Sequence, residues 1–309
     1  MPPHHALAAW NDGAARGALL EFVANACDPA SPGFVAPERR IAVFAQDGTL
    51  CCEFPLPLHA LFIGARLEQL AAQRPSLRDR HPFSAFLRED LPRVHGLGWR
   101  GVLQLGLVLH AGLALEEFTA RTEAWLADAR HPWLARSVLS CAYQPQLELL
   151  ALLRDAGFTV FVVTAGESAF ARALAAAAFG LPMHQVIGTC TRVKMETMAD
   201  GAELVRLAQE ERINEREEKV RAIAMHIGQR PVLAFGNADR DLAMLQYVAA
   251  GAGPRLALLL RHDDGVREFA YDHGFALNPL DRALELAVET GLRVVSMRED
   301  WRTVFPSSS

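Results

Sequence analysis

The sequence predicts an α/β fold: a doubly wound, mostly parallel sheet with an all-helical domain inserted into it. Three short apolar runs, Ile41–Phe44, Phe158–Val163 and Pro231–Phe235, each end at a polar break. Apolar runs of this length are typical of strands that are buried on both faces of a parallel sheet. Helical patterns alternate with the later runs, which indicates right-handed crossovers between parallel strands.

The N-terminal elements come before the first strand. The pattern predicts a helix that ends near Cys27 and is capped by Asn11 or Asp12. Residues 28–39 are rich in Pro, Gly and Ser, so we expect a loop that leads into the strand at Ile41.

A long helical stretch follows the first strand. From about His59 to Ala135, apolar residues recur at three- and four-residue spacing, and no strand pattern occurs. A stretch of about 75 residues is large enough for a small core of its own. We therefore predict an α/β core made of residues 1–57 and 140–309, and a helical domain made of residues 58–139. Three tryptophans are expected to pack inside that domain: Trp99, Trp125 and Trp133.

Strands and helices alternate again from Tyr143 onward. Pro145 and Gly157 mark the start and end of a helix, because proline suits a first helical turn and glycine suits a helix end. The remaining expected elements are helices at 168–179, 215–227 and 281–291, strands at 186–188, 256–260 and 292–296, and a hairpin of residues 192–198 with 203–207.

Composition narrows the possible partners and the compartment. Hydrophobic residues make up 51% of the chain and the formal net charge is -5, so we expect a well-packed protein that binds no nucleic acid. No apolar window is long enough to span a membrane. The first ten residues lack the basic and apolar regions of a signal peptide, which favours a cytoplasmic protein and leaves a processed periplasmic form open. The five cysteines are expected to be free thiols.

Polar residues follow the three apolar runs, and they form the candidate site. They are Asp47; Thr164, Ala165 and Gly166; and Asn237, Asp239 and Asp241. The carboxyl ends of parallel strands lie at one edge of a sheet, where ligands bind in such folds. Carboxylate and amide oxygens suit a magnesium ion, and hydroxyl and backbone N–H groups suit phosphate oxygens. Lys219 adds a charge that can balance those oxygens, so the sequence predicts a phosphate and Mg2+ site.

These groups resemble, in order and spacing, the four motifs of the haloacid dehalogenase (HAD) superfamily. Asp47 matches the second aspartate of motif one, Thr164 the hydroxyl residue of motif two, and Lys219 the lysine of motif three. Motif four, which in one version reads Gly-Asn-Ser-Asp-Gly-Asp, includes Asn237, Asp239 and Asp241. Further segments such as DGTL-x-CEFPLP, HPW and MREDW resemble a bacterial branch of HAD phosphatases related to phosphoserine phosphatase.

The resemblance implies Mg2+-dependent hydrolysis of a small phosphate monoester on a Rossmann-like core. In the family, the first aspartate of motif one attacks phosphorus and forms an aspartyl-phosphate. The second aspartate protonates the leaving oxygen and then activates water, and magnesium bridges the nucleophile and the phosphoryl group. The inserted helical domain is implied to be a cap that excludes water and shapes substrate choice.

One departure from the family pattern dominates the functional expectation. Ala45 stands where the nucleophilic aspartate is expected, so the carboxylate that attacks phosphorus is absent. Loss of a nucleophile lowers turnover by roughly 10⁴–10⁶, and magnesium should also bind more weakly. The chain is therefore expected to be a nearly inactive phosphatase or, alternatively, a non-catalytic protein that binds a phosphorylated ligand or a partner protein. Acid/base chemistry by Asp47 without a covalent step is a third possibility.

Two further departures bear on the origin of Ala45. Glu167 replaces a usual glycine beside the Thr164 loop, and residues Glu215–Glu218 replace a usual glycine-containing turn. These changes favour natural divergence, whereas an engineered substitution would alter position 45 alone, and both origins remain open.

Each candidate residue also has a purely structural interpretation. Asp47 can cap a turn, Thr164 can be an ordinary hydroxyl at a strand end, and Lys219 can be a solvated charge on a helix. Asp239 and Asp241 can stabilise a helix N-terminus through its dipole. The order and spacing of the four motifs together favour the functional interpretation. The pattern does not indicate the substrate or the oligomeric state.

Overall fold

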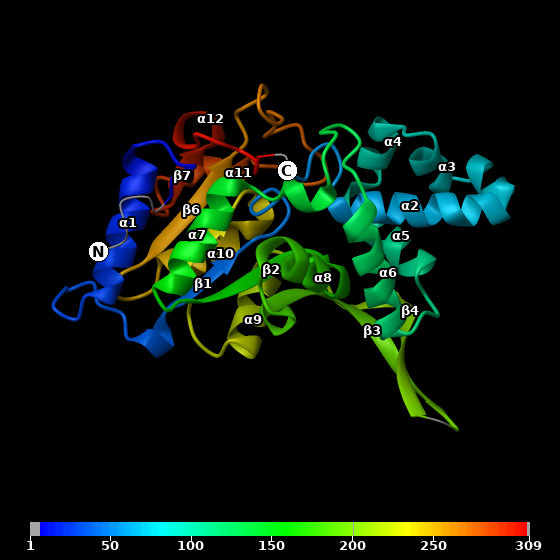
Figure 1. The fold of residues 1–309 in the computed structure, drawn as a ribbon, viewed down its shortest axis with the longest axis horizontal. Helices are drawn as coiled ribbons and strands as arrows, with labels where there is room; N and C mark the ends of the chain where they lie inside the picture. Colours follow the sequence, from blue (N-terminus) through cyan, green and yellow to red (C-terminus); the bar gives the residue numbers. More distant parts are fainter. Residues whose placement is uncertain (1–6, 200, 308–309) are drawn as a thin grey trace.

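The computed structural model describes residues 7–199 and 201–307. Its centre is a seven-stranded sheet with the order β4-β3-β2-β1-β5-β6-β7 (Figure 1), in which all neighbours pair in parallel except β3 and β4. The strands are β1 (Ile41–Phe44), β2 (Thr159–Glu167), β3 (Val186–Met198), β4 (Gly201–Arg212), β5 (Leu233–Gly236), β6 (Leu256–Arg261) and β7 (Arg293–Ser296). The predicted α/β fold class with a mostly parallel sheet is confirmed.

Helices cover both faces of this sheet. The helices of the described residues are α1 (Ala14–Cys27), α2 (Leu58–Gln73), α3 (Phe83–Leu87), α4 (Leu91–Gly96), α5 (Gly98–Leu109), α6 (Leu115–Asp128), α7 (Gln144–Asp155), α8 (Ser168–Phe179), α9 (Glu217–His226), α10 (Leu242–Ala249), α11 (Arg282–Glu285) and α12 (Met297–Asp300). Helices α1, α7 and α8 pack on one face, and α9 and α10 on the other. None of the helices in the described part of the chain combines the length and the apolar character needed to cross a membrane.

The central strand β1 shows how the two faces are filled. Ala42 and Phe44 join the apolar cluster formed with α1, α7 and α8, whereas Val43 and Ala45 join the cluster formed with α9 and α10. Side chains alternate between the two faces of a strand, so a strand with helices on both sides needs apolar residues at every position. The same alternation directs Ala45 toward the α9 and α10 side.

The segment between β1 and β2 is helical, as predicted. Helices α2 to α6 lie together beside the sheet, and the hairpin of β3 and β4 runs along α5 and α6 (Figure 1). One apolar cluster within this segment includes Ile63, Leu67 and Val102. Phe62 and Phe118 instead join the main core around α8, so the segment is packed against the α/β core. The division into two domains at residues 58 and 139 stays a prediction.

Several predicted boundaries differ from the structure. Helix α1 begins after Gly13 without a side-chain cap, because the Asp12 carboxylate pairs with Arg16 instead. The expected helix at 281–291 ends at Glu285. Residues expected as a short strand and half of a hairpin form the single strand β3, which pairs in parallel with β2 and then antiparallel with β4. Residue 200, in the expected hairpin turn, lies outside the described residues, and all five cysteines are free thiols.

Candidate functional site

The ends of three neighbouring strands enclose a small cavity, which we name the strand-end cavity. Its volume is about 30 Å3. Residues from the β1, β2 and β5 ends, α9 and the helical segment line it: Ala45, Gln46, Asp47, Glu53, Pro57, Trp99, Thr164, Ala165, Gly166, Lys219, Arg240, Asp241, Leu277 and Asn278. Parallel pairing of β1 with β2 and β5 places these strand ends side by side. The predicted residues at positions 45, 47, 164–166, 219 and 241 therefore lie in one place.

Asp47 follows β1 at the wall of this cavity. Its Oδ1 atom is shielded from solvent and has no hydrogen-bond partner. Desolvation by burial raises the pKa of Asp47 to about 6, against the opposing effects of a hydrogen bond to Gln46 and the charges of Arg240 and Lys219. A carboxyl group with a pKa in this range can both donate and accept a proton near neutral pH.

The turn after Asp47 depends on a glycine. Gly48 has a φ of +73°, which favours a residue without a Cβ atom. An added Cβ would also overlap the side chains of Asn237 and Glu53. The turn therefore brings motif-one and motif-four residues closer together than any other residue type at position 48 would allow.

Lys219 is buried and fixed by two strong contacts. Its Nζ atom donates to Asp241 Oδ1 at 2.6 Å and to the carbonyl oxygen of Val163 at 2.7 Å. The second oxygen of Asp241 accepts from the backbone N–H groups of Asn237 and Ala238. Lys219 is only 1% exposed, so its interpretation as a solvated helix charge is wrong. The pair joins α9, β2 and the loop after β5.

Thr164 is held in a tight local geometry. Its Oγ1 atom accepts from the backbone N–H of Gly166 at 2.9 Å. Asn214 donates to the Thr164 carbonyl oxygen, and Thr189 donates to the Ala165 carbonyl oxygen. A hydroxyl that accepts one hydrogen bond can still donate another, so Thr164 can offer its O–H to an oxyanion in the cavity.

Two of the predicted metal ligands have other roles in this structure. Asn237 Oδ1 accepts from the Thr49 hydroxyl at 2.8 Å, and its amide donates to Glu53 Oε1 at 2.7 Å. The Asp239 carboxylate accepts from the backbone N–H groups of residues 281, 282 and 283 at the start of α11. Asp239 does not line the strand-end cavity. It acts as the helix N-terminal acid that the structural interpretation of the sequence described.

Comparison with known proteins gives the family. A profile of the haloacid dehalogenase-like hydrolases matches residues 42–246, which span β1, Thr164, Lys219 and the loop after β5. The chain belongs to this family. No curated protein gives a significant match.

Solved structures of low sequence identity share the HAD fold. A functionally unknown protein from Anaerococcus prevotii DSM 20548 aligns with 15% identity, a TM-score of 0.55 and 90% coverage of both chains. A protein of unknown function from Bordetella pertussis Tohama I aligns with 20% identity and a TM-score of 0.51, covering 83% of this chain and 98% of its own. A phosphoserine phosphohydrolase-like protein from Francisella tularensis has 15% identity, coverage of 73% and 89%, and a TM-score of 0.40, too low to add to the comparison.

The donor set of the HAD site does not fit a magnesium ion in this arrangement. Mg2+ needs near-octahedral oxygen coordination, usually with one or two carboxylates. Both Asp241 oxygens and the Asn237 amide oxygen accept from protein donors, and Ala45 offers no oxygen. The lining oxygens that have no partner belong to one carboxylate, Asp47, and to two neutral amides, Gln46 and Asn278. Among residues 7–199 and 201–307, no group of three or more acidic, histidine or cysteine side chains is arranged to hold a metal. Asp47 remains a carboxylate with a buried, unpartnered oxygen.

The HAD motifs did not indicate three residues that the structure adds to the site. Glu53 is buried and accepts from Asn237, Asn278 and Tyr271. Desolvation by burial raises the pKa of Glu53 to about 7. The guanidinium of Arg240 lies 5.3 Å from the ring centroid of Trp99, and both side chains line the cavity. The sequence signal for Arg240 is the arginine within GNADRD, at a position where the quoted family motif has glycine.

The expectation that the three tryptophans pack in the helical core is confirmed for Trp125, whose ring lies 5.4 Å from that of Phe62 and packs against the main apolar cluster, and is wrong for the other two. Trp99 is half-buried at the strand-end cavity and Trp125 lines a second cavity, whereas Trp133 is 40% exposed. A sequence pattern shows that a tryptophan is on a helix, but not which neighbouring segment its ring contacts.

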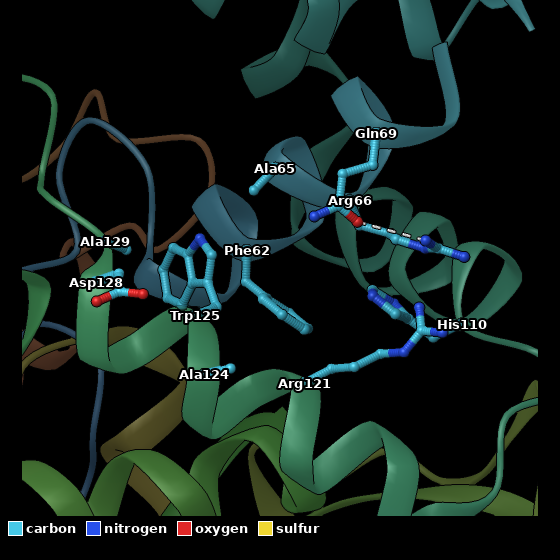
Figure 2. Close-up of a pocket in the computed structure, with 10 residues that line it drawn as sticks. All are labelled: Phe62, Ala65, Arg66, Gln69, His110, Arg121, Ala124, Trp125, Asp128 and Ala129. Atoms are coloured by element: carbon cyan, nitrogen blue, oxygen red, sulfur yellow. Dashed lines mark hydrogen bonds between the residues drawn. The ribbon is translucent and has the colours of Figure 1, made fainter. Parts of the chain in front are cut away.

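The second cavity is larger and lies within the helical segment. Its volume is about 520 Å3, and Figure 2 shows Arg66 and Gln69 of α2 facing Arg121 and Trp125 of α6 across it. It shares no lining residue with the strand-end cavity and contains none of the predicted site residues. The chemistry predicted from the HAD motifs therefore belongs to the smaller cavity.

Proposed function

We propose that this chain binds the phosphate group of a small phosphate monoester in the strand-end cavity and hydrolyses it extremely slowly. Its parent chemistry is phosphate monoester hydrolysis of the HAD type. The observation that carries the proposal is the position of Ala45, which lines the same cavity as Asp47, Thr164 and Lys219 but carries a methyl group. The site thus retains groups for phosphate and proton handling without a nucleophile.

The remaining residues of the cavity supply hydrogen-bond donors, positive charge and an acid. Thr164 and the backbone of its loop offer donors to phosphate oxygens, and Lys219 supplies positive charge close to them. Asp47, with its pKa raised to about 6 by burial, is suited to protonate a leaving oxygen. No aspartyl-phosphate can form at Ala45, so we expect turnover roughly 10⁴–10⁶ below that of a complete enzyme.

Restoration of the carboxylate tests this function. We expect Ala45→Asp to raise hydrolysis of p-nitrophenyl phosphate by at least about 10³-fold over the parent chain, because a nucleophile is regained. Ala45→Asn is the matched control, since it has a similar size and no carboxylate. The assay is run with and without Mg2+, and melting curves establish that each variant is folded.

The alternative is a purely binding protein, and the fully engaged Asp241 and Asn237 side chains favour it. If Ala45→Asp stays as inactive as Ala45→Asn while both bind a phosphate monoester, the chain is a binding protein in which one substitution does not restore catalysis. If none of the three proteins binds phosphate compounds or turns them over, the proposed function is wrong.

A further inference from the structure

Arg240 occupies an unusual place in the strand-end cavity. It lies in the loop after β5, between Asp239 and Asp241, and its guanidinium donates to the carbonyl oxygen of Leu277. The Trp99 ring of α5 lies beside it, with a distance of 5.3 Å from the guanidinium carbon to the ring centroid. These contacts fix a permanently charged group at the cavity wall.

This charge lies at the same cavity as several carboxylates. Arg240 lines the same cavity as the carboxyl groups of Asp47 and Glu53. Lys219 is already paired with Asp241 at 2.6 Å. Of the two cations that line the cavity, Lys219 pairs with a carboxylate, whereas Arg240 donates to the uncharged carbonyl oxygen of Leu277.

The charge balance of the site explains why such a cation matters. A phosphate monoester is a dianion near neutral pH, and its binding beside Asp47 requires compensating positive charge. The predicted metal ligands do not fit magnesium here, since the Asp241 and Asn237 oxygens already accept hydrogen bonds from the protein and Ala45 has no carboxylate. This leaves Asp47 as the lining carboxylate with an unpartnered oxygen. Arginine suits the task without a metal, because its guanidinium fork donates to two oxygens of a phosphoryl group.

We propose that Arg240 takes the place of the divalent cation, so that the strand-end cavity binds a phosphoryl group independently of magnesium. The inference rests on the proposed function and deepens it, since it names the group that neutralises the ligand. It follows from one juxtaposition: a tethered guanidinium and Asp47 line the same cavity, where both Asp241 oxygens accept from protein donors and Ala45 supplies no carboxylate.

The test is a calorimetric titration of the full chain with inorganic phosphate, in EDTA and in excess Mg2+. We expect the parent Kd to agree within about twofold between the two conditions. Arg240→Gln should weaken binding at least tenfold in EDTA, because the fork is lost, and Arg240→Lys should recover part of the affinity. Arg66→Gln is the matched control, since it removes one charge from the separate cavity in the helical segment.

Each contrary outcome has a defined meaning. If parent binding requires Mg2+ and disappears in EDTA, the metal-independent role of Arg240 is wrong while phosphate binding stands. If Arg240→Gln binds phosphate more tightly, the arginine blocks the cavity and the inference is overturned. If the parent chain binds no phosphate in either buffer, the proposed function itself fails. Melting curves confirm that each variant is folded before it is titrated.

Discussion

Ala45 is 3% exposed, and its backbone N–H donates to the carbonyl oxygen of Phe235 at 2.8 Å. The backbone at position 45 is thus held by the sheet whatever side chain it carries. A replacement at this position changes the chemistry of the cavity wall and leaves the pairing of β1 with β5 intact. This is why position 45 is suited to a gain-of-function experiment.

Two buried histidines of the helical segment give a prediction about pH. His59 is 3% exposed and His110 is 1% exposed. Desolvation by burial lowers the pKa of each to about 4. For His59 the negative charge of Glu167 raises the pKa, but this effect is smaller than that of desolvation. Their folded-state pKa lies below the unfolded value of 6.5, so the unfolded chain binds protons more readily and stability is lost as pH falls from about 6.5 toward 4.

We expect the free energy of unfolding to fall by about 3 kcal/mol for each of these histidines as the pH is lowered from about 6.5 to 4, because protonation favours the unfolded chain. His110→Phe should abolish its share, because the ring stacks on Phe62 at 5.0 Å and 4°, a geometry that phenylalanine can adopt. Urea denaturation of both proteins at several pH values measures the difference. A parent and variant with parallel pH profiles would show that His110 does not contribute.

At the scale of elements, a buried ion pair joins β2 to the hairpin. Arg206 of β4 pairs with Glu167 at the end of β2, and neither side chain is more than 1% exposed. The backbone of Arg206 also exchanges hydrogen bonds with residues 112 and 113 of the helical segment. Glu167, a departure from the family pattern, thus connects the phosphate loop to the elements around the cavity.

Removal of one partner of the Arg206–Glu167 ion pair should destabilise the fold. We expect Arg206→Met to destabilise the fold by about 3–5 kcal/mol, because it leaves the Glu167 charge buried and unpaired. The double variant Glu167→Gln, Arg206→Met should recover much of that loss. Arg192→Met is the matched control on the same hairpin, since the exposed pair of Arg192 and Glu211 is worth less than about 1 kcal/mol. Equal losses in urea denaturation for both single variants would contradict this account.

The elements also show what sequence patterns can predict. β1, β5 and the first part of β2 were predictable because each is a short apolar run, whereas β2 continues through the polar residues after Val163 to Glu167. The helix expected at 281–291 stops at Glu285, and Val288 is 90% exposed, so packing does not stabilise its last turns. β3 was predicted as two pieces because its first half is buried and its second half is exposed, which changes the pattern within one strand.

For the whole molecule, the strand-end cavity is closed by the helical segment. Its volume of about 30 Å3 is close to the space of one water molecule in the liquid. Trp99 and Pro57 form part of its wall, and Arg100 of α5 pairs with Glu215 of the core. If the cavity binds a phosphate monoester as proposed, we expect the helical segment to move away from the core to admit it, as lids do in many enzymes.

The site was predictable where sequence order encodes it. Asp47 and Asp241 follow β1 and β5, and Thr164 lies near the carboxyl end of β2, so the parallel sheet places the three residues at one edge. Glu53, Arg240 and Trp99 were missed because they come from segments far apart in the sequence that meet only through tertiary packing. Asp239 was assigned to the metal site since spacing alone does not show which way a side chain turns.

The central claim is that position 45 faces a phosphate-binding cavity from which only the nucleophile is missing. Peptide mass spectrometry of acid-quenched Ala45→Asp, after incubation with p-nitrophenyl phosphate, tests it most directly. The account predicts one added phosphoryl group on residue 45 of the variant and none on the parent chain. A folded Ala45→Asp protein that stays unmodified at residue 45, or carries the phosphoryl group on another residue, would contradict the claim.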